Sequence, residues 1–234
     1  MKLKDAVAGK SNYLFLGEAG CGKSEIAVNL ALELAEAGER PVHFFDLDMT
    51  KPLFRSRDVQ ALLEARGVTV HFQEQFMDAP TTVGGPGVLL RDESCYTILD
   101  VGGDYMGASA VGGYAALLRP ETTAAYYVVN SFRPWSMRME HIDGVLGQVL
   151  GAAHLPLDRL RFLGNPNLGV RTTAAEVREG LQRLKETLGA FVEIPFACVW
   201  EELWPMEDPD LPLVPLKLYL TYPWEMTIRS QPGG

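Results

Sequence analysis

The residues best suited to chemistry form a glycine-rich loop near the start of the sequence. Residues 17–24 read Gly-Glu-Ala-Gly-Cys-Gly-Lys-Ser and match the pattern G-x-x-x-x-G-K-[ST] at every fixed position. Glycine adopts backbone conformations that are closed to other residues, so such a loop can turn consecutive N–H groups toward phosphate oxygens. We therefore predict that this glycine loop binds the phosphates of a nucleotide. The predicted contacts are Gly17, Glu18, Ala19, Gly20, Cys21, Gly22, Lys23, Ser24 and Glu25.

The elements on either side of the glycine loop suit this role. An apolar run at residues 13–16 predicts a strand, and helical apolar spacing over residues 25–37 predicts a helix that stops at Gly38. The loop would then lead from a strand into a helix, whose amino-terminal end favours anions. In this context a glycine turn that binds nothing is the weaker interpretation.

Carboxylates follow two further predicted strands. Asp46 and Asp48 come directly after residues 41–45, and Asp100 follows residues 96–99. The carboxyl ends of parallel strands line the ligand crevice of an open α/β sheet. A strand-end aspartate often only caps a turn, but beside a glycine loop it is suited to hold Mg²⁺. We predict Ser24, Asp46 and Asp100 as the metal ligands.

This arrangement resembles the MinD/ParA-like branch of P-loop ATPases, which also includes the nitrogenase iron protein and the nickel-insertion protein of carbon monoxide dehydrogenase. The resemblance covers about residues 11–200. It rests on the glycine loop, on Asp-Leu-Asp at 46–48 with Lys-Pro at 51–52, on Leu-Asp-Val-Gly-Gly at 99–103, and on Asn165 after a late strand.

The resemblance implies ATP and Mg²⁺ as ligands and assigns roles to individual residues. Asp48 would help to position the attacking water, and Asn165 would recognise the adenine edge, since a carboxamide offers both a donor and an acceptor. The catalytic residues are then expected to be Lys23, Asp48 and Asp100. Pro195 is expected to join Asn165 at the nucleotide.

One position departs from the family pattern. Members of the family commonly carry a lysine directly after the first glycine, and this lysine contacts the nucleotide of a partner subunit across a dimer. Glu18 and then Ala19 stand here instead, and phosphate repels a carboxylate at short range. Either this dimer does not form, or a neighbouring cation supplies the charge. The candidates are Lys51, Arg55 and Arg57, which are equally suited to an exposed surface.

Short apolar runs alternate with helical segments along the chain, which predicts an α/β fold with a mostly parallel sheet between helices. Further strands are expected at residues 68–72, 125–129, 160–163 and 191–194, and further helices at 58–65, 136–150 and 172–188. No repeat or linker divides the sequence, so residues 1–234 are expected to form one domain. A Pro-rich tail, expected to wrap the surface or meet a partner, begins at about residue 205.

Bulk composition excludes several classes of function. The formal charge of −9 and the pI near 5.0 disfavour nucleic acid and anionic membranes. Three dispersed cysteines indicate reduced thiols, and no run of 18 apolar residues predicts a membrane span, so we expect a cytoplasmic protein.

The function expected from the resemblance is a slow molecular-switch ATPase that acts on a protein partner, with an ATP-dependent homodimer as one form of association. Two other functions fit the same sequence. One is a nucleotide-binding scaffold that does not hydrolyse ATP. The other is a small-molecule kinase or ATP-dependent ligase, with a substrate pocket from residues 105–114 and the region of Trp135.

Overall fold

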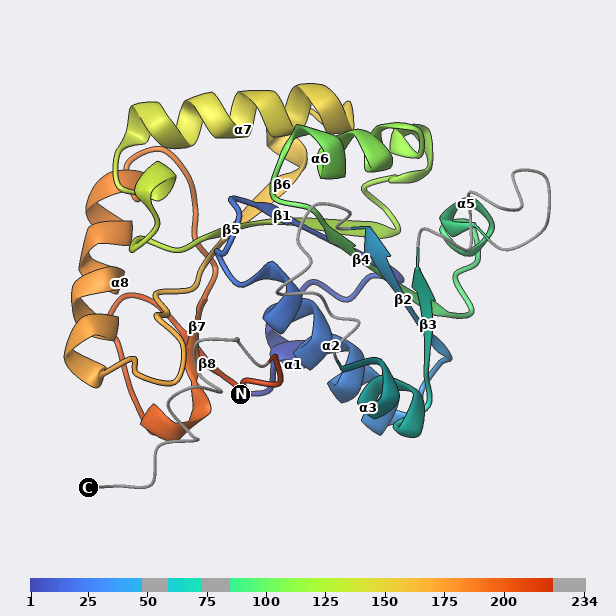
Figure 1. Cartoon of the computed structure of the whole chain (residues 1–234), viewed down its shortest axis with the longest axis horizontal. Helices are drawn as coiled ribbons and strands as arrows, with labels where there is room; N and C mark the ends of the chain where they lie inside the picture. The colour runs from blue at the N-terminus through green and yellow to red at the C-terminus, as the bar shows by residue number, and fades with distance from the viewer. Residues whose placement is uncertain (48–58, 73–84, 221–234) are drawn as a thin grey trace, which may run out of the picture.

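The computed structural model describes residues 1–47, 59–72 and 85–220, and these residues build one sheet of eight strands. The strand order is β3-β2-β4-β1-β5-β6-β7-β8, and each neighbouring pair is parallel (Figure 1). The strands are β1 (Asn12–Gly17), β2 (Val42–Leu47), β3 (Val68–Phe72), β4 (Tyr96–Val101), β5 (Thr123–Val129), β6 (Leu160–Gly164), β7 (Ala197–Trp200) and β8 (Leu213–Leu216).

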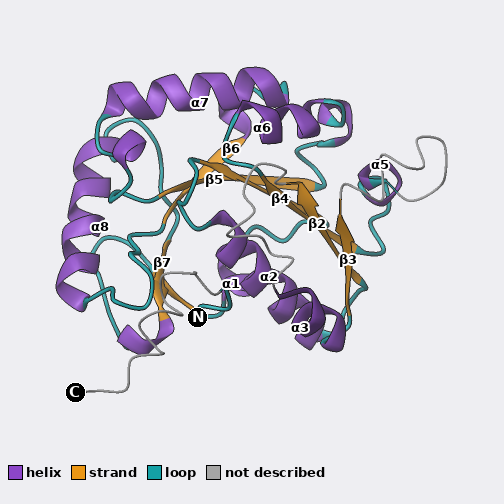
Figure 2. Ribbon diagram, viewed as in Figure 1, coloured by secondary structure: helices purple, strands orange, loops and turns teal. Residues whose placement is uncertain are grey.

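Helices cover both faces of the sheet and give three layers (Figure 2). One face carries α1 (Leu3–Ala6), α2 (Lys23–Ala37) and α3 (Gln60–Ala65). The other face carries α6 (Tyr105–Gly112), α7 (Met139–Ala153) and α8 (Ala174–Leu188). A short helix, α5 (Pro86–Leu89), precedes β4, and single 3₁₀ turns are η2 (Ala115–Leu117), η3 (Pro134–Ser136), η4 (Leu157–Arg159) and η5 (Glu201–Leu203). The predicted α/β fold with a parallel sheet between helices is confirmed.

The central strand β1 lies between β4 and β5 and is buried along its whole length. A strand that is covered on both faces needs apolar side chains on both, which explains the unbroken run Tyr-Leu-Phe-Leu at 13–16. Phe15 packs toward α2, whereas Leu14 and Leu16 pack toward α7. The chain leaves the centre of the sheet at Gly17, and the helix that follows ends at Gly38 in the left-handed conformation, with φ of 67°.

Most predicted elements lie where the sequence placed them. The structure has β3 at exactly the predicted residues, and α8 begins with a complete capping box in which Thr173 and Glu176 exchange hydrogen bonds. The helix predicted from residue 136 starts later, at Met139, because residues 134–136 form the η3 turn.

Two predictions near the end of the chain are wrong. Residues 191–194 are not a strand: Phe191 is exposed, and Pro195, which has no N–H to donate, interrupts the run. The strand in this region is β7, which begins six residues later than predicted, at Ala197. Part of the segment after residue 205 does not wrap the surface but adds β8 to the edge of the sheet beside β7.

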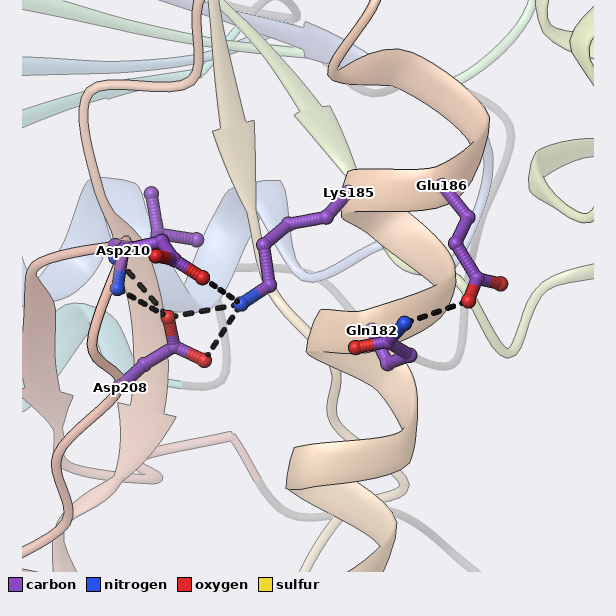
Figure 3. Close-up of polar contacts among 6 residues, drawn as sticks. Gln182, Lys185, Glu186, Asp208 and Asp210 are labelled. Carbon is purple, nitrogen blue, oxygen red and sulfur yellow. Dashed lines mark hydrogen bonds and ion pairs between the residues drawn. The ribbon is translucent and has the colours of Figure 1, made fainter.

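The path into β8 is fixed by an ion cluster on α8 (Figure 3). The ammonium of Lys185 lies 3.0 Å from both carboxylate oxygens of Asp208 and 3.0 Å from Asp210. One oxygen of Asp208 also accepts hydrogen bonds from the backbone N–H groups of Asp210 and Leu211. The loop before β8 is therefore held against the helix by charge-assisted bonds.

Two expectations about the whole chain can be compared with the described part. Cys21, Cys95 and Cys198 are buried, and none of the three forms a disulfide within the described residues. None of the described helices combines the length and the apolar character that crossing a bilayer requires.

Candidate nucleotide site

The glycine loop joins β1 to α2 through three glycines with positive φ. The φ angles are 139° at Gly17, 76° at Gly20 and 97° at Gly22, a region that L side chains rarely adopt. Neighbouring atoms also leave no space for larger residues. A Cβ on Gly22 would lie 2.1 Å from Nδ2 of Asn165, and one on Gly17 would lie 2.4 Å from the carbonyl oxygen of Val128. Both the conformation and the packing therefore require glycine.

Several backbone N–H groups of this loop are available to a ligand. The N–H of Cys21 donates to the carbonyl of Glu18 at 3.2 Å, whereas those of Gly20, Gly22 and Lys23 donate to no acceptor in the described part of the chain. Lys23 starts α2, so the favourable dipole of the helix end adds to these donors. The buried ammonium of Lys23 turns into the loop and donates to the Glu18 carbonyl oxygen at 3.0 Å. This arrangement is an anion-binding concavity.

The side chain of Glu18 does not point into the concavity. Its carboxylate accepts a hydrogen bond from the hydroxyl of Ser136 at 2.8 Å and one from the backbone N–H of Trp135 at 3.3 Å. Only 6% of Glu18 is exposed. The negative charge that the sequence places within the glycine loop is therefore directed to the η3 turn, where two donors stabilise it.

Two side chains that are distant in the sequence, one after β5 and one after β6, donate hydrogen bonds to the glycine loop. Nε of Arg133 donates to the carbonyl oxygen of Gly20 at 2.8 Å, and Nδ2 of Asn165 donates to the carbonyl oxygen of Cys21 at 2.8 Å. Arg133 and Ser136 were not among the predicted site residues. They follow β5, next to β1 in the sheet, so the rule that ligands lie at carboxyl ends of strands could have pointed to them.

The strand-end carboxylates lie side by side. Asp46 of β2 and Asp100 of β4 are register partners, and each is 1% exposed. Phe44 and Ile98, two residues before Asp46 and Asp100, pack in the same cluster as α2. Side chains two residues apart in a strand lie on the same face, so both carboxylates face the side of the sheet that α2 covers. Ser24 lies in the first turn of that helix. The structure thus brings the three predicted metal ligands to one end of one face.

The segment after β4 packs directly on the glycine loop. A Cβ on Gly103 would lie 2.5 Å from the backbone nitrogen of Ala19 and 2.9 Å from the carbonyl carbon of Glu18. Asp104 then caps α6 by accepting from the N–H of Gly107. The segment that follows β4 and the glycine loop are therefore in backbone contact.

A small hollow of about 40 Å³ opens beside the glycine loop. Its wall includes Gly20, Gly22, Arg133 and Asn165. The carboxamide oxygen of Asn165 is buried and accepts no hydrogen bond within the described residues. Binding pockets for small molecules typically enclose about 300–1,000 Å³, so a nucleoside would have to displace part of this wall.

The start of α2 also contacts the chain after β8, and the hollow is lined there by Leu216, the last residue of β8, and by Leu218. The carboxylate of Glu25 accepts hydrogen bonds from the backbone N–H groups of Tyr219 and Leu220. Asn29 accepts from the N–H of Lys217 at 3.0 Å and donates to its carbonyl at 2.8 Å. The side chain of Glu25 therefore binds the backbone of residues 219 and 220. Its backbone N–H belongs to the first turn of α2, the end of the helix that faces the glycine loop.

Two predicted residues lie elsewhere. Pro195 is not near the glycine loop: it lines a separate hollow of about 550 Å³ with Lys10, Thr123 and Arg161, from the amino-terminal ends of β1, β5 and β6. The proline lies before β7 rather than after it, so it is on the wrong side of that strand for the nucleotide site. Asp48 lies outside the described residues, as do Lys51, Arg55 and Arg57.

No family model and no curated protein sequence matches the chain. Among solved structures, the signal recognition particle 54 kDa protein from Aeropyrum pernix K1 in complex with GDP has 16% identity and a TM-score of 0.48. The match covers 83% of this chain but only 43% of that one.

Two other solved structures are similar to the same extent. FlhF complexed with GMPPNP/Mg²⁺ has 10% identity and a TM-score of 0.47, over 97% of this chain and 80% of that one. The signal recognition particle receptor FtsY from Elizabethkingia anophelis in complex with GDP has 13% identity and a TM-score of 0.47, over 86% and 60%. Similarity at this level concerns only the general course of the chain and identifies neither nucleotide nor activity.

Proposed function

We propose that this chain binds Mg-ATP on the glycine loop and acts as a slow molecular-switch ATPase. The observation that carries the proposal is the concavity itself: N–H groups of Gly20, Gly22 and Lys23, which donate to no acceptor among the described residues, surround a buried ammonium at a helix start. Such a set of donors is complementary to a phosphate chain. In this proposal the phosphates replace the Glu18 carbonyl as the partner of Lys23.

Magnesium would be held at the neighbouring end of β2 and β4. Mg²⁺ in phosphate sites commonly uses one or two carboxylates, a hydroxyl, phosphate oxygens and several waters. Asp46, Asp100 and Ser24 match that donor set, and a divalent cation would offset the cost of burying two adjacent carboxylates. Bound there, the ion would neutralise phosphate charge. Among the described residues no three or more His, Cys, Asp or Glu are grouped so that they could hold a metal ion by themselves, and the proposed site uses two carboxylates with a hydroxyl and phosphate oxygens.

The preference for ATP over GTP rests on Asn165. One N–H of its Nδ2 donates to the Cys21 carbonyl, whereas the carboxamide oxygen accepts no hydrogen bond within the described residues, so we assign that oxygen to the base. An acceptor suits the exocyclic amino group of adenine and repels the carbonyl oxygen that guanine carries at the same place. The adenine edge would therefore lie beside Asn165, close to the Cys21 carbonyl of the glycine loop.

Hydrolysis is proposed from the family resemblance, with Asp48, which lies outside the described residues, positioning the attacking water. Binding to a protein partner is proposed from the same resemblance. One feature of the structure favours a protein partner. Four large apolar side chains beside the glycine loop are exposed by more than half. They are Tyr105 and Met106 at the start of α6, and Trp135 and Met137 around η3. Apolar groups exposed around a binding loop mark contact sites for other proteins.

The test is calorimetric titration of the purified protein with ADP and with a non-hydrolysable ATP analogue, both with Mg²⁺, alongside phosphate release from ATP. We expect saturable binding by the wild type, and loss of at least about 100-fold in affinity in Lys23→Ala, since a charge-assisted contact to two phosphates disappears. Arg161→Gln, at the opposite end of the sheet, is the matched loss of one surface cation and should bind normally.

Each result has a clear meaning. Normal binding by Lys23→Ala would contradict the proposal. Binding without phosphate release would leave the nucleotide site in place and identify the scaffold rather than the ATPase. Phosphate release that appears only with an added small molecule would identify the kinase or ligase. The same titration is repeated with GDP and a non-hydrolysable GTP analogue, and tighter binding of these than of the adenine nucleotides would overturn the role of Asn165.

A further inference from the structure

The guanidinium of Arg133 is placed over the glycine loop and has unused donors. Its Nε donates to the Gly20 carbonyl at 2.8 Å, and it makes no other hydrogen bond and no ion pair within the described residues. A guanidinium carries five N–H donors in a rigid plane. Most of this fork therefore remains available beside the donors of the loop.

Arg133 is also part of the wall that a nucleotide would meet. It lines the same small hollow as Gly20, Gly22 and Asn165, and its Cζ would lie 3.1 Å from a Cβ at Gly20. The guanidinium is thus in van der Waals contact with the phosphate loop. No carboxylate in the described chain neutralises it, so its charge acts on whatever binds there.

Glu18 fixes the position of this arginine. Its buried carboxylate binds the N–H of Trp135 and the hydroxyl of Ser136, two and three residues after Arg133. Two contacts therefore join residues 130–136 to the glycine loop. Ser136 donates to the Glu18 carboxylate, and Arg133 donates to the Gly20 carbonyl oxygen. The Glu18 carboxylate, which would repel phosphate, thus positions the Arg133 guanidinium, which attracts phosphate.

We infer that Arg133 binds the phosphate chain of the nucleotide in cis, with Glu18 as its positioning residue, and so replaces the cation that Glu18 removes from the loop. This inference rests on the proposed nucleotide binding. It predicts that one chain binds nucleotide at full strength, without a cation from a second copy.

The experiment is titration of wild type, Arg133→Gln and Arg133→Lys with ADP and with a non-hydrolysable ATP analogue. We expect Arg133→Gln to weaken binding of both by about 10- to 100-fold, the range for a lost charge-assisted contact. Arg133→Lys, which keeps the charge but loses the planar fork, should fall between. Arg161→Gln should bind as the wild type does. Thermal unfolding of each variant checks that the fold is retained.

Glu18 is tested through its dependence on Arg133. Glu18→Ala should weaken nucleotide binding in the wild type by about the same factor as Arg133→Gln, yet add less than about twofold in an Arg133→Gln background. Glu18→Gln, which can still accept from Ser136, should keep affinity within about threefold. Equal losses in both backgrounds would overturn the positioning role.

The outcomes separate this inference from the function on which it rests. If the wild type binds no nucleotide, or Lys23→Ala binds normally, the proposed function fails first. If the wild type binds and Lys23→Ala does not, but Arg133→Gln binds normally, only the role of Arg133 is overturned. Affinity that rises with protein concentration would likewise contradict a cation supplied in cis.

Discussion

The direction of a charged side chain decides its effect more than its position in the sequence does. Glu18 is the second residue of the glycine loop, yet its carboxylate is satisfied by Ser136 and Trp135 on the far side of the loop. Lys23 of the glycine loop and Arg133 of the loop after β5 instead donate to carbonyl groups of the glycine loop. The loop is thus electropositive toward a ligand despite the acid within it.

A prediction at this scale concerns Gly103. A Cβ there would lie 2.5 Å from the backbone nitrogen of Ala19, and backbone cannot move away as a flexible side chain can. Gly103→Ala should therefore separate the β4 loop from the glycine loop, lower the free energy of unfolding by about 1–3 kcal/mol and weaken nucleotide binding at least tenfold. Urea denaturation and calorimetric titration measure the two effects.

Gly113→Ala is the matched control for this change. Nothing lies within 4 Å of a Cβ at Gly113, and its backbone is already right-handed helical, with φ of −62°. The control should be neutral or slightly stabilising. If Gly103→Ala were as harmless as Gly113→Ala, the contact between the two loops would have no importance for the site.

At the scale of elements, the sequence revealed what is encoded locally. The glycine loop, its strand and its helix are adjacent in the chain, so one pattern identified all three. The contact between Arg133 and Gly20 joins residues 113 positions apart, and no local pattern reports it. The same limit explains β7 and β8: two four-residue strands containing or following proline carry little periodicity, and their pairing at the sheet edge makes them strands.

The cluster that leads into β8 gives a prediction about acid. Burial would raise the pKa of Asp208, but hydrogen bonds from Lys185 and from the N–H groups of Asp210 and Leu211 outweigh it and hold that pKa below 3.8. The folded protein therefore binds this proton less readily than the unfolded chain. The stabilisation is complete above pH of about 4 and is lost as the pH falls through the lowered pKa.

Asp208→Asn should accordingly lower the free energy of unfolding by about 1–3 kcal/mol at pH 7. The difference from wild type should shrink on acidification through the lowered pKa, because the wild-type carboxyl is then protonated as well. Urea denaturation between pH 7 and pH 2.5 measures this. Asp210→Asn removes the exposed partner of the same lysine and should cost less than half as much. A difference that stayed constant with pH would contradict the ionic origin.

Across the whole molecule, the glycine loop connects segments that are far apart in sequence. It contacts the chain after β4 through Gly103, the loop after β5 through Arg133 and the end of β6 through Asn165. The helix it begins holds residues 217–220 through Glu25 and Asn29. Because one ligand would contact the centre of these connections, its binding is expected to reach all of them together.

Hydrogen exchange with and without nucleotide tests this coupling. Ligand at 100 times its dissociation constant should raise the free energy of unfolding by about 2.7 kcal/mol. Exchange should slow together in residues 17–25, 130–136, 165–169 and 216–220, whereas α3 and β3, at the other side of the sheet, should show only the global effect. Lys23→Ala with the same ligand should show neither change. Protection confined to residues 17–25 would mean that the connected segments do not respond to the nucleotide. A partner could then detect bound nucleotide only by contacting the glycine loop itself.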